Sequence, residues 1–318
     1  MRRLRKFLLY SACLVLSVLL LASLTTWITS GTSQQITARV HHRADTTKTP
    51  VPGTARPAGT LQVMTLNLAH GRRDSLNQIF LGRQTIRRNL AKIAAVIKTY
   101  RLDAVALQEA DHVSFWSGHF DHISFLAAQA RLPYSLHGLH VDGLKIRYGT
   151  ALLTRHAPHD SYSYVFKPSP PTFSKGFVIT TIGWPGDPDF KVDLVSVHLD
   201  YSRHAIRRQQ LEKMLAFLRQ RNRPTILMGD FNVDWRQEKQ GLYRLLIQQG
   251  FEGTKPAAGR QVTFPSAGTR LDWILVSHGL QLKSETILKQ NISDHYAVIA
   301  TIQRKPVSLT STDTKSTD

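Results

Sequence analysis

The stretch PTILMGDFN, residues 224–232, indicates the fold class and the kind of site that this chain carries. Its apolar run is followed by Gly229, which allows a close approach, and then by Asp230 and Asn232. Short apolar runs bounded by Gly, Pro or charge are typical of buried strands. The stretch therefore predicts a strand that ends on a carboxylate and an amide. On its own, such a pair is most often a turn or cap.

Similar apolar runs recur along the chain and alternate with turn residues. Further strands are predicted over residues 61–68, 103–109, 150–155, 176–184, 191–199, 270–277 and 295–303. Apolar residues at three- and four-residue steps predict helices over 83–101 and 204–222, with a shorter one over 241–249. Mixed strands with few helices favour two packed β-sheets with helices outside, in one domain over residues 61–304.

Polar residues stand at the ends of many of these strands. Val105, Leu107 and Glu109 alternate along one strand, so they are predicted to share one face that finishes on an acid. Loops at one end of a sandwich come together in space, and sites are built there. The other polar residues at predicted strand ends are Asn67, His198, Asp272, Asp294 and His295.

This set of residue types favours metal-assisted phosphoester hydrolysis. Carboxylates suit a hard cation such as Mg²⁺ or Mn²⁺, and the single cysteine, Cys13, excludes a cysteine-rich zinc site. An acid beside an amide suits water activation, and an imidazole beside an acid can stabilise a pentavalent phosphorus state. The chain has no Walker loop, GxSxG elbow or HExxH motif, which argues against the corresponding hydrolase classes.

Taken together, these segments resemble the endonuclease/exonuclease/phosphatase superfamily, which includes deoxyribonuclease-I-like enzymes, abasic-site endonucleases, neutral sphingomyelinases and inositol polyphosphate 5-phosphatases. The matching motifs, in the family's order, are TLN (65–67), LQE (107–109), YGTALLTR (148–155), SVHL (196–199), GDFN (229–232), LDWI (271–274) and SDH (293–295). The resemblance implies a four-layer α/β sandwich that hydrolyses phosphoesters.

The resemblance also implies metal ligands. Glu109 is the expected principal ligand of Mg²⁺ or Mn²⁺, with Asn67 beside it at the metal or phosphate and Asp294 on the metal side. Some DNA-repair members carry an acid shortly after the position of Asn67. Here Leu68, Ala69 and His70 follow, so that extra ligand is missing, which weakens the abasic-site interpretation.

The remaining matches imply catalytic roles. Asp230 is expected to orient or deprotonate the attacking water, and Asn232 to hold the scissile phosphate. His198 is expected to stabilise the transition state or assist the leaving group. His295 is expected to contact the phosphate, oriented by Asp272.

The charge balance favours an anionic substrate. The chain has a net charge of +19, and residues 61–300 hold 30 basic and 19 acidic residues. Such a domain suits nucleic acid or phospholipid. The leading hypothesis is a nuclease-like or broad phosphodiesterase, and a sphingomyelinase- or phospholipase-C-like enzyme is the alternative. An inactive binding module on the same fold is a third hypothesis, which the intact motifs oppose. No protein partner is inferred.

The N-terminal region predicts export. Arg2, Arg3, Arg5 and Lys6 precede residues 7–29, which carry no charge and are long enough to span a bilayer. Residues 1–29 are therefore predicted to be an uncleaved signal-anchor helix, with the catalytic domain outside the cytoplasm. The alternative is a cleaved signal peptide and a secreted protein. Residues 30–60 are predicted to be a flexible linker and 305–318 a disordered tail.

Overall fold

Two seven-stranded sheets stack face to face in the computed structural model, which describes residues 34–38, 40–42, 59–234, 241–253, 261–306 and single positions between 10 and 28. The β9 sheet has the order β1 (Gln34–Thr37), β7 (His159–Val165), β8 (Gly176–Trp184), β9 (Asp187–His198), β10 (Thr225–Asp230), β12 (Asp272–Val276) and β11 (Glu252–Gly253). The β3 sheet has the order β13 (Leu280–Leu288), β14 (Ala297–Arg304), β3 (Thr60–Asn67), β4 (Ala104–Asp111), β6 (Ile146–Thr154), β5 (Tyr134–Gly143) and β2 (Val40–His42).

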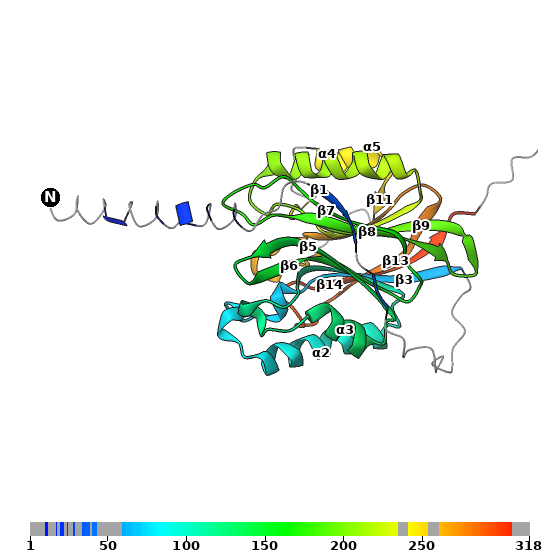
Figure 1. The fold of residues 1–318 in the computed structure, drawn as a ribbon. Helices are drawn as coiled ribbons and strands as arrows, with labels where there is room; N and C mark the ends of the chain where they lie inside the picture. The colour runs from blue at the N-terminus through cyan, green and yellow to red at the C-terminus, as the bar shows by residue number, and fades with distance from the viewer. Residues whose placement is uncertain are drawn as a thin grey trace, which may run out of the picture.

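Helices cover the outer face of each sheet (Figure 1). The β3 sheet is covered by α2 (Arg83–Thr99) and α3 (His122–Ala130). The β9 sheet is covered by α4 (His204–Arg221) and α5 (Leu242–Gln248). The predicted α/β sandwich of two mixed sheets with helices outside is therefore confirmed.

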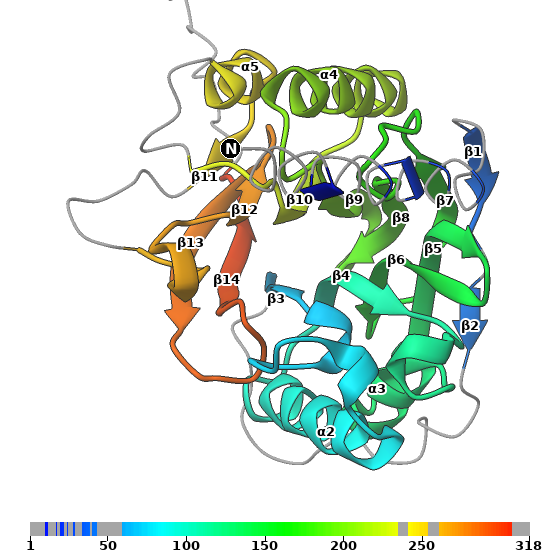
Figure 2. The same cartoon turned by 90° about the vertical axis from the view of Figure 1, so that its left-hand side faces the viewer.

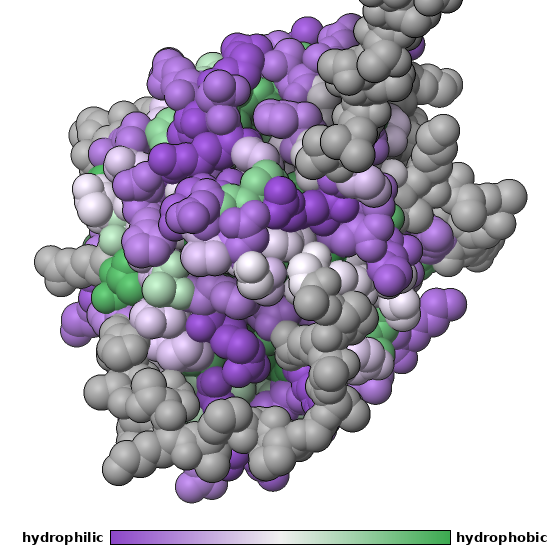
Figure 3. Space-filling view, turned by 90° about the vertical axis from the view of Figure 1, so that its right-hand side faces the viewer, coloured by the Kyte–Doolittle hydropathy of each residue, from purple (hydrophilic) through white to green (hydrophobic). Residues whose placement is uncertain are grey.

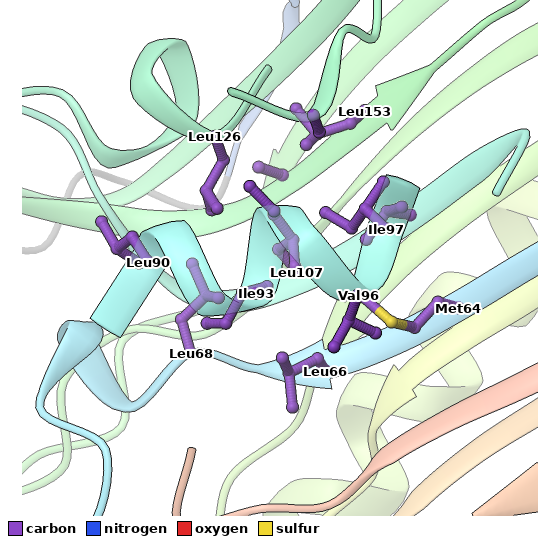
Figure 4. Close-up of a cluster of buried hydrophobic side chains, with 14 of the residues drawn as sticks. Met64, Leu66, Leu68, Leu90, Ile93, Val96, Ile97, Leu107, Leu126 and Leu153 are labelled. Carbon is purple, nitrogen blue, oxygen red and sulfur yellow. The ribbon is translucent and has the colours of Figure 1, made fainter. Parts of the chain in front are cut away.

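The alternation of side chains along each strand produces three apolar layers. On β4, Ala104 and Ala106 point between the two sheets, whereas Val105 and Leu107 point toward α2 and α3. Figure 4 shows the outer layer, in which side chains of the helix and the sheet meet. Burying a valine or leucine side chain contributes about 1.5–3 kcal/mol, so each layer fixes the position of its strands.

All eight predicted strands and three predicted helices are present, with ends displaced by a few residues. The structure adds α3, β5, β7 and β13, which had not been predicted. Histidines and glycines interrupt the apolar pattern of β5. The centre of β13, at a sheet edge, is the polar run Lys-Ser-Glu-Thr (283–286).

The N-terminal region differs from the prediction in one respect. Residues 34–37 and 40–42, within the predicted linker, form β1 and β2, which pair with β7 and β5 through backbone hydrogen bonds. The predicted transmembrane helix of residues 7–29 lies for the most part outside the described residues, as does the tail after residue 306. Among the residues that the structure does describe, no helix has the length and apolar character needed to cross a membrane.

The strand directions place many loop residues at one end of the sandwich. β3 is parallel to β4, and β9 is parallel to β10, so the carboxyl ends of each pair lie together. Figure 2 shows these four strands around the centre of the molecule. On the opposite side of the molecule, the residues drawn in colour in Figure 3 are mostly hydrophilic.

Candidate active site

Asp230 occupies the centre of the site because its strand lies between two others. At the end of β10 it pairs with His198 of parallel β9 on one side and with Asp272 of antiparallel β12 on the other. The His198 Nε2 atom is 3.5 Å from the Asp230 carboxylate. Gly229 permits this approach: a Cβ atom there would lie 2.0 Å from the carbonyl oxygen of Val197.

Hydrogen bonds across the sandwich bring the β3 sheet to the same place. The Asn67 Nδ2 atom donates to Asp230 at 3.1 Å, which joins the end of β3 to the end of β10. Deeper in the interface, Gln108 donates to the Ser196 hydroxyl at 3.1 Å. His295, just before β14, has its Nδ1 atom 2.8 Å from the Asp272 carboxylate. These contacts join residues from both sheets into one site.

Glu109 reaches the site through a β-bulge. The pairing of β4 with β6 shifts between Leu107 and Ala110, and Glu109 has a left-handed φ of 47°. A bulge of this kind turns a side chain away from its regular direction. The predicted common face therefore holds for Val105 and Leu107 but not for Glu109, which lines the cavity.

A cavity of about 350 Å³ opens between the ends of the two sheets. Seven of the eight predicted site residues line it, namely Asn67, Glu109, His198, Asp230, Asn232, Asp294 and His295. Asp272, the eighth, is fully buried behind the ring of His295. The predicted residues are therefore brought together, while the individual role of each stays a prediction.

The charges of the site follow from burial and close neighbours. Burial and the nearby Asp272 carboxylate raise the pKa of Asp230 to about 7. Although burial favours the neutral ring, the Asp272 carboxylate raises the pKa of His295 to about 10, so His295 is cationic at neutral pH. Burial and the neighbouring Lys175 ammonium hold the pKa of His198 well below its usual value, so that ring is neutral.

Two cationic residues in the cavity had not been predicted. Lys175 is 7% exposed, and its Nζ atom lies 3.2 Å from the His198 Nε2 atom. Arg72 binds Asp294 through a 2.5 Å hydrogen bond. A lone Lys before a strand and an Arg in a loop are ordinary surface residues in a single sequence. Nothing in the sequence distinguishes Lys175 and Arg72 from such surface residues.

The residues present fit a divalent metal ion at Glu109. Its carboxylate is partly exposed to the cavity, and within the described part of the chain no hydrogen bond to it is formed. The oxygens of Asn67 and Asp294 are in use, because Asn67 accepts from the Ala69 amide and Asp294 binds Arg72. Their predicted roles as ligands therefore stay predictions.

A second group of possible ligands lies on the other side of the cavity. The side-chain ligand atoms of Asp230, Asp272 and His295 lie within 4.8 Å of one another. Because His295 and Asp272 already bind each other, this group holds a proton as it stands. The two sides of the cavity thus differ: within the described residues Glu109 accepts no hydrogen bond, whereas the Asp272 carboxylate binds the imidazole of His295.

Buried carboxylates, imidazoles and a lysine around one cavity, at the matching ends of two stacked sheets, define a hydrolase of anionic esters. The family model described as "Endonuclease/Exonuclease/phosphatase family" matches residues 64–295. The chain belongs to this family and is a phosphoester hydrolase, from a family that is typically dependent on divalent metal ions. The search of curated proteins found no match.

Solved structures share the fold at low sequence identity. An endonuclease/exonuclease/phosphatase from Bacteroides vulgatus is 18% identical, with a TM-score of 0.62 over 77% of this chain and 99% of that one. Beta toxin from Staphylococcus aureus is 17% identical, with a TM-score of 0.55 over 76% and 99%. TDP2 from Caenorhabditis elegans is 18% identical, with a TM-score of 0.55 over 77% and 74%. These likenesses support the fold rather than a particular substrate.

Proposed function

We propose that this protein is a divalent-metal-dependent phosphodiesterase with nucleic acid as its leading substrate. The observation that carries the proposal is the pairing of Asp230, whose pKa of about 7 suits a general base, with a cavity that also holds the cations Lys175 and His295. A base and two phosphate-binding cations thus face the same space. Attack of water on a phosphodiester needs a base that takes the proton of the water and positive charge that stabilises the phosphate oxygens.

In the proposed reaction, Asp230 takes a proton from the attacking water. Asn67 and the backbone N–H of Asn232 bind its two carboxylate oxygens and so fix its direction. As the new oxygen–phosphorus bond forms, the bond to the leaving oxygen breaks. Lys175 and His295 bind the phosphate oxygens, and His295 supplies the proton that the leaving alkoxide takes.

The uncharged His198 lies between Lys175 and Asp230, so its proposed contribution to the transition state is a hydrogen bond rather than a charge. A divalent ion at Glu109 would add Lewis-acid stabilisation of the negative charge on the phosphate. Asn67 and Asp294 stay the proposed neighbours of that ion. Mg²⁺ or Mn²⁺ suits the carboxylate.

The basic domain supports a polyanionic substrate, because Lys and Arg side chains bind phosphates along a nucleic acid and release counterions. One observation favours phospholipid as a second candidate. In η3 (Gln78–Phe80) and just before it, Leu76, Ile79 and Phe80 are 90%, 51% and 76% exposed. η3 contacts η4 (Phe115–Ser117), whose Trp116 ring packs against His70, a neighbour of the cavity residue Glu109. Exposed apolar side chains gathered in one segment suit a lipid surface.

The test is relaxation of supercoiled plasmid by the full-length protein in mild detergent, with Mg²⁺ or Mn²⁺. Activity lost with EDTA and in Asp230→Asn, but kept in Asp189→Asn on the exposed start of β9, is the expected result. A parallel arm measures phosphate-headgroup release from phosphatidylcholine and sphingomyelin vesicles. Release from vesicles without plasmid relaxation would replace nucleic acid by phospholipid. Hydrolysis of neither substrate above the Asp230→Asn background would refute the proposal.

We also propose that the catalytic domain faces outward and is tethered to a membrane. The support is the cationic start and the uncharged residues 7–29 of the sequence. Protease added to intact cells should cleave the domain while the protein stays with the membrane fraction. A mature N-terminus beyond residue 29, found by sequencing, would favour the secreted alternative. Full protection from external protease would contradict outward exposure.

A further inference from the structure

The imidazole of His70 stands beside the metal-binding candidate Glu109 in an unusual arrangement. The His70 Nε2 atom is 3.4 Å from a Glu109 carboxylate oxygen, and no hydrogen bond joins them. On its other side, the Nδ1 atom lies 2.7 Å from the Asp111 carboxylate. In the neutral tautomer that carries its proton on Nδ1, next to Asp111, the lone pair of Nε2 lies on the side of the Glu109 oxygen.

The surroundings of His70 fix its ring in this direction. The ring packs against Trp116 and Tyr148, at centroid distances of 4.9 and 4.8 Å. Asp111 is fully buried and also accepts a 2.8 Å hydrogen bond from the Trp116 indole. A buried carboxylate that holds the distal nitrogen of an imidazole is the usual support of a metal-binding histidine.

The backbone bends sharply to place both side chains. Ala69 and His70 have left-handed φ angles of 46° and 54°, and Glu109, opposite, has 47°. A left-handed non-glycine residue is energetically unfavourable and persists where the surrounding structure requires it, often at functional sites. Both members of the facing pair carry this cost. A simple surface ion pair would not require it.

We propose that His70 is a direct ligand of the metal ion held by Glu109. The proposal deepens the proposed function, on whose metal site it rests. It also revises the expectation that the segment after Asn67 lacks a further metal ligand, because an imidazole stands there in place of an acid. A mixed imidazole and carboxylate site binds Mn²⁺, Co²⁺ or Zn²⁺ better than an all-oxygen site does, whereas Mg²⁺ gains little from nitrogen.

The test is electron spin-echo envelope modulation of Mn²⁺ bound to the full-length, chelator-treated protein. The expected spectrum shows ¹⁴N modulation from a coordinated imidazole, which changes to that of ¹⁵N when the histidines are labelled. The signal should vanish in His70→Gln and persist in His295→Gln, which removes the other imidazole closest to the carboxylates. Titration should show at least tenfold weaker Mn²⁺ binding in His70→Gln and a smaller change for Mg²⁺.

The outcomes separate this inference from the proposed function. Bound Mn²⁺ without nitrogen modulation in the wild-type protein would overturn the inference and leave His70 as an ion-pair partner of Glu109, with metal-dependent hydrolysis intact. This measurement needs no variant, so it holds even if His70→Gln fails to fold. Modulation that persists in a folded His70→Gln protein would also overturn it. Absence of any Mn²⁺ binding would contradict both the inference and the proposed metal-dependent function.

Discussion

Replacing Gly229 by alanine tests how tightly the strand packing controls the site. The added Cβ atom would lie 2.0 Å from the Val197 carbonyl oxygen of β9, and such contacts are not found below 3.0 Å. β9 and β10 must therefore separate locally by about 1 Å, which breaks one or two ladder hydrogen bonds. At about 1 kcal/mol for each bond and 1–3 kcal/mol for overpacking, Gly229→Ala should lower the free energy of unfolding by about 3 kcal/mol.

The same displacement separates His198 from Asp230. A misplacement of about 1 Å can cost about 100-fold in rate, so kcat for bis(p-nitrophenyl) phosphate should fall by that factor. The matched control is Gly186→Ala, in the turn between β8 and β9. It also has a positive φ, of 83°, but its Cβ would meet no atom within 4 Å. Urea unfolding and steady-state kinetics of both variants provide the measurements. Equal stability and equal kcat in the two variants would refute the reasoning.

Three further results are expected. Lys175→Met should lower kcat by about 100- to 1,000-fold, because a buried cation that faces the phosphate is lost. Urea unfolding should change little, because methionine keeps the volume of the side chain. A rate within threefold of wild type would contradict this. Hydrogen bonds outweigh burial and keep the pKa of Asp200 below its usual range, so its stabilisation is present above pH 4 and lost in acid. Asp200→Asn should therefore cost about 2 kcal/mol in urea unfolding at pH 7 and clearly less at pH 2, whereas an equal cost at both would exclude the charge as cause. Glu285→Ala leaves the fully buried Arg270 without its 2.6 Å ion-pair partner and should cost about 3–5 kcal/mol, which Arg270→Met in addition should partly restore.

Regular periodicity made most of the fold predictable. The apolar steps of α2 and α4 and the apolar runs of β3, β8, β9 and β10 reflect burial on one or both faces, which a single sequence reveals directly. β5 and β7 were not predicted because histidine, serine and tyrosine occupy many of their buried and half-buried positions. Pairing with neighbours rather than apolar composition makes them strands.

The candidate site was predictable where residues follow strands, as Asp230 and His198 do. Glu109 was predicted as a site residue, but the β-bulge that turns its side chain into the cavity was not. The alternation of apolar and polar residues along β4 does not reveal that bulge. Lys175 and His70 were missed as site residues, since their importance arises from contacts with residues far away in the sequence. Such contacts are products of the tertiary fold.

The two short N-terminal strands change the reach of the proposed tether. A free spacer of residues 30–60 could extend about 100 Å at 3.3–3.6 Å per residue. Because β1 already joins the sheet at Gln34, only residues 30–33 remain between the predicted membrane segment and the folded domain. That length corresponds to about 15 Å. An anchored enzyme would work as a surface-bound catalyst, restricted to molecules that come almost to the lipid headgroups.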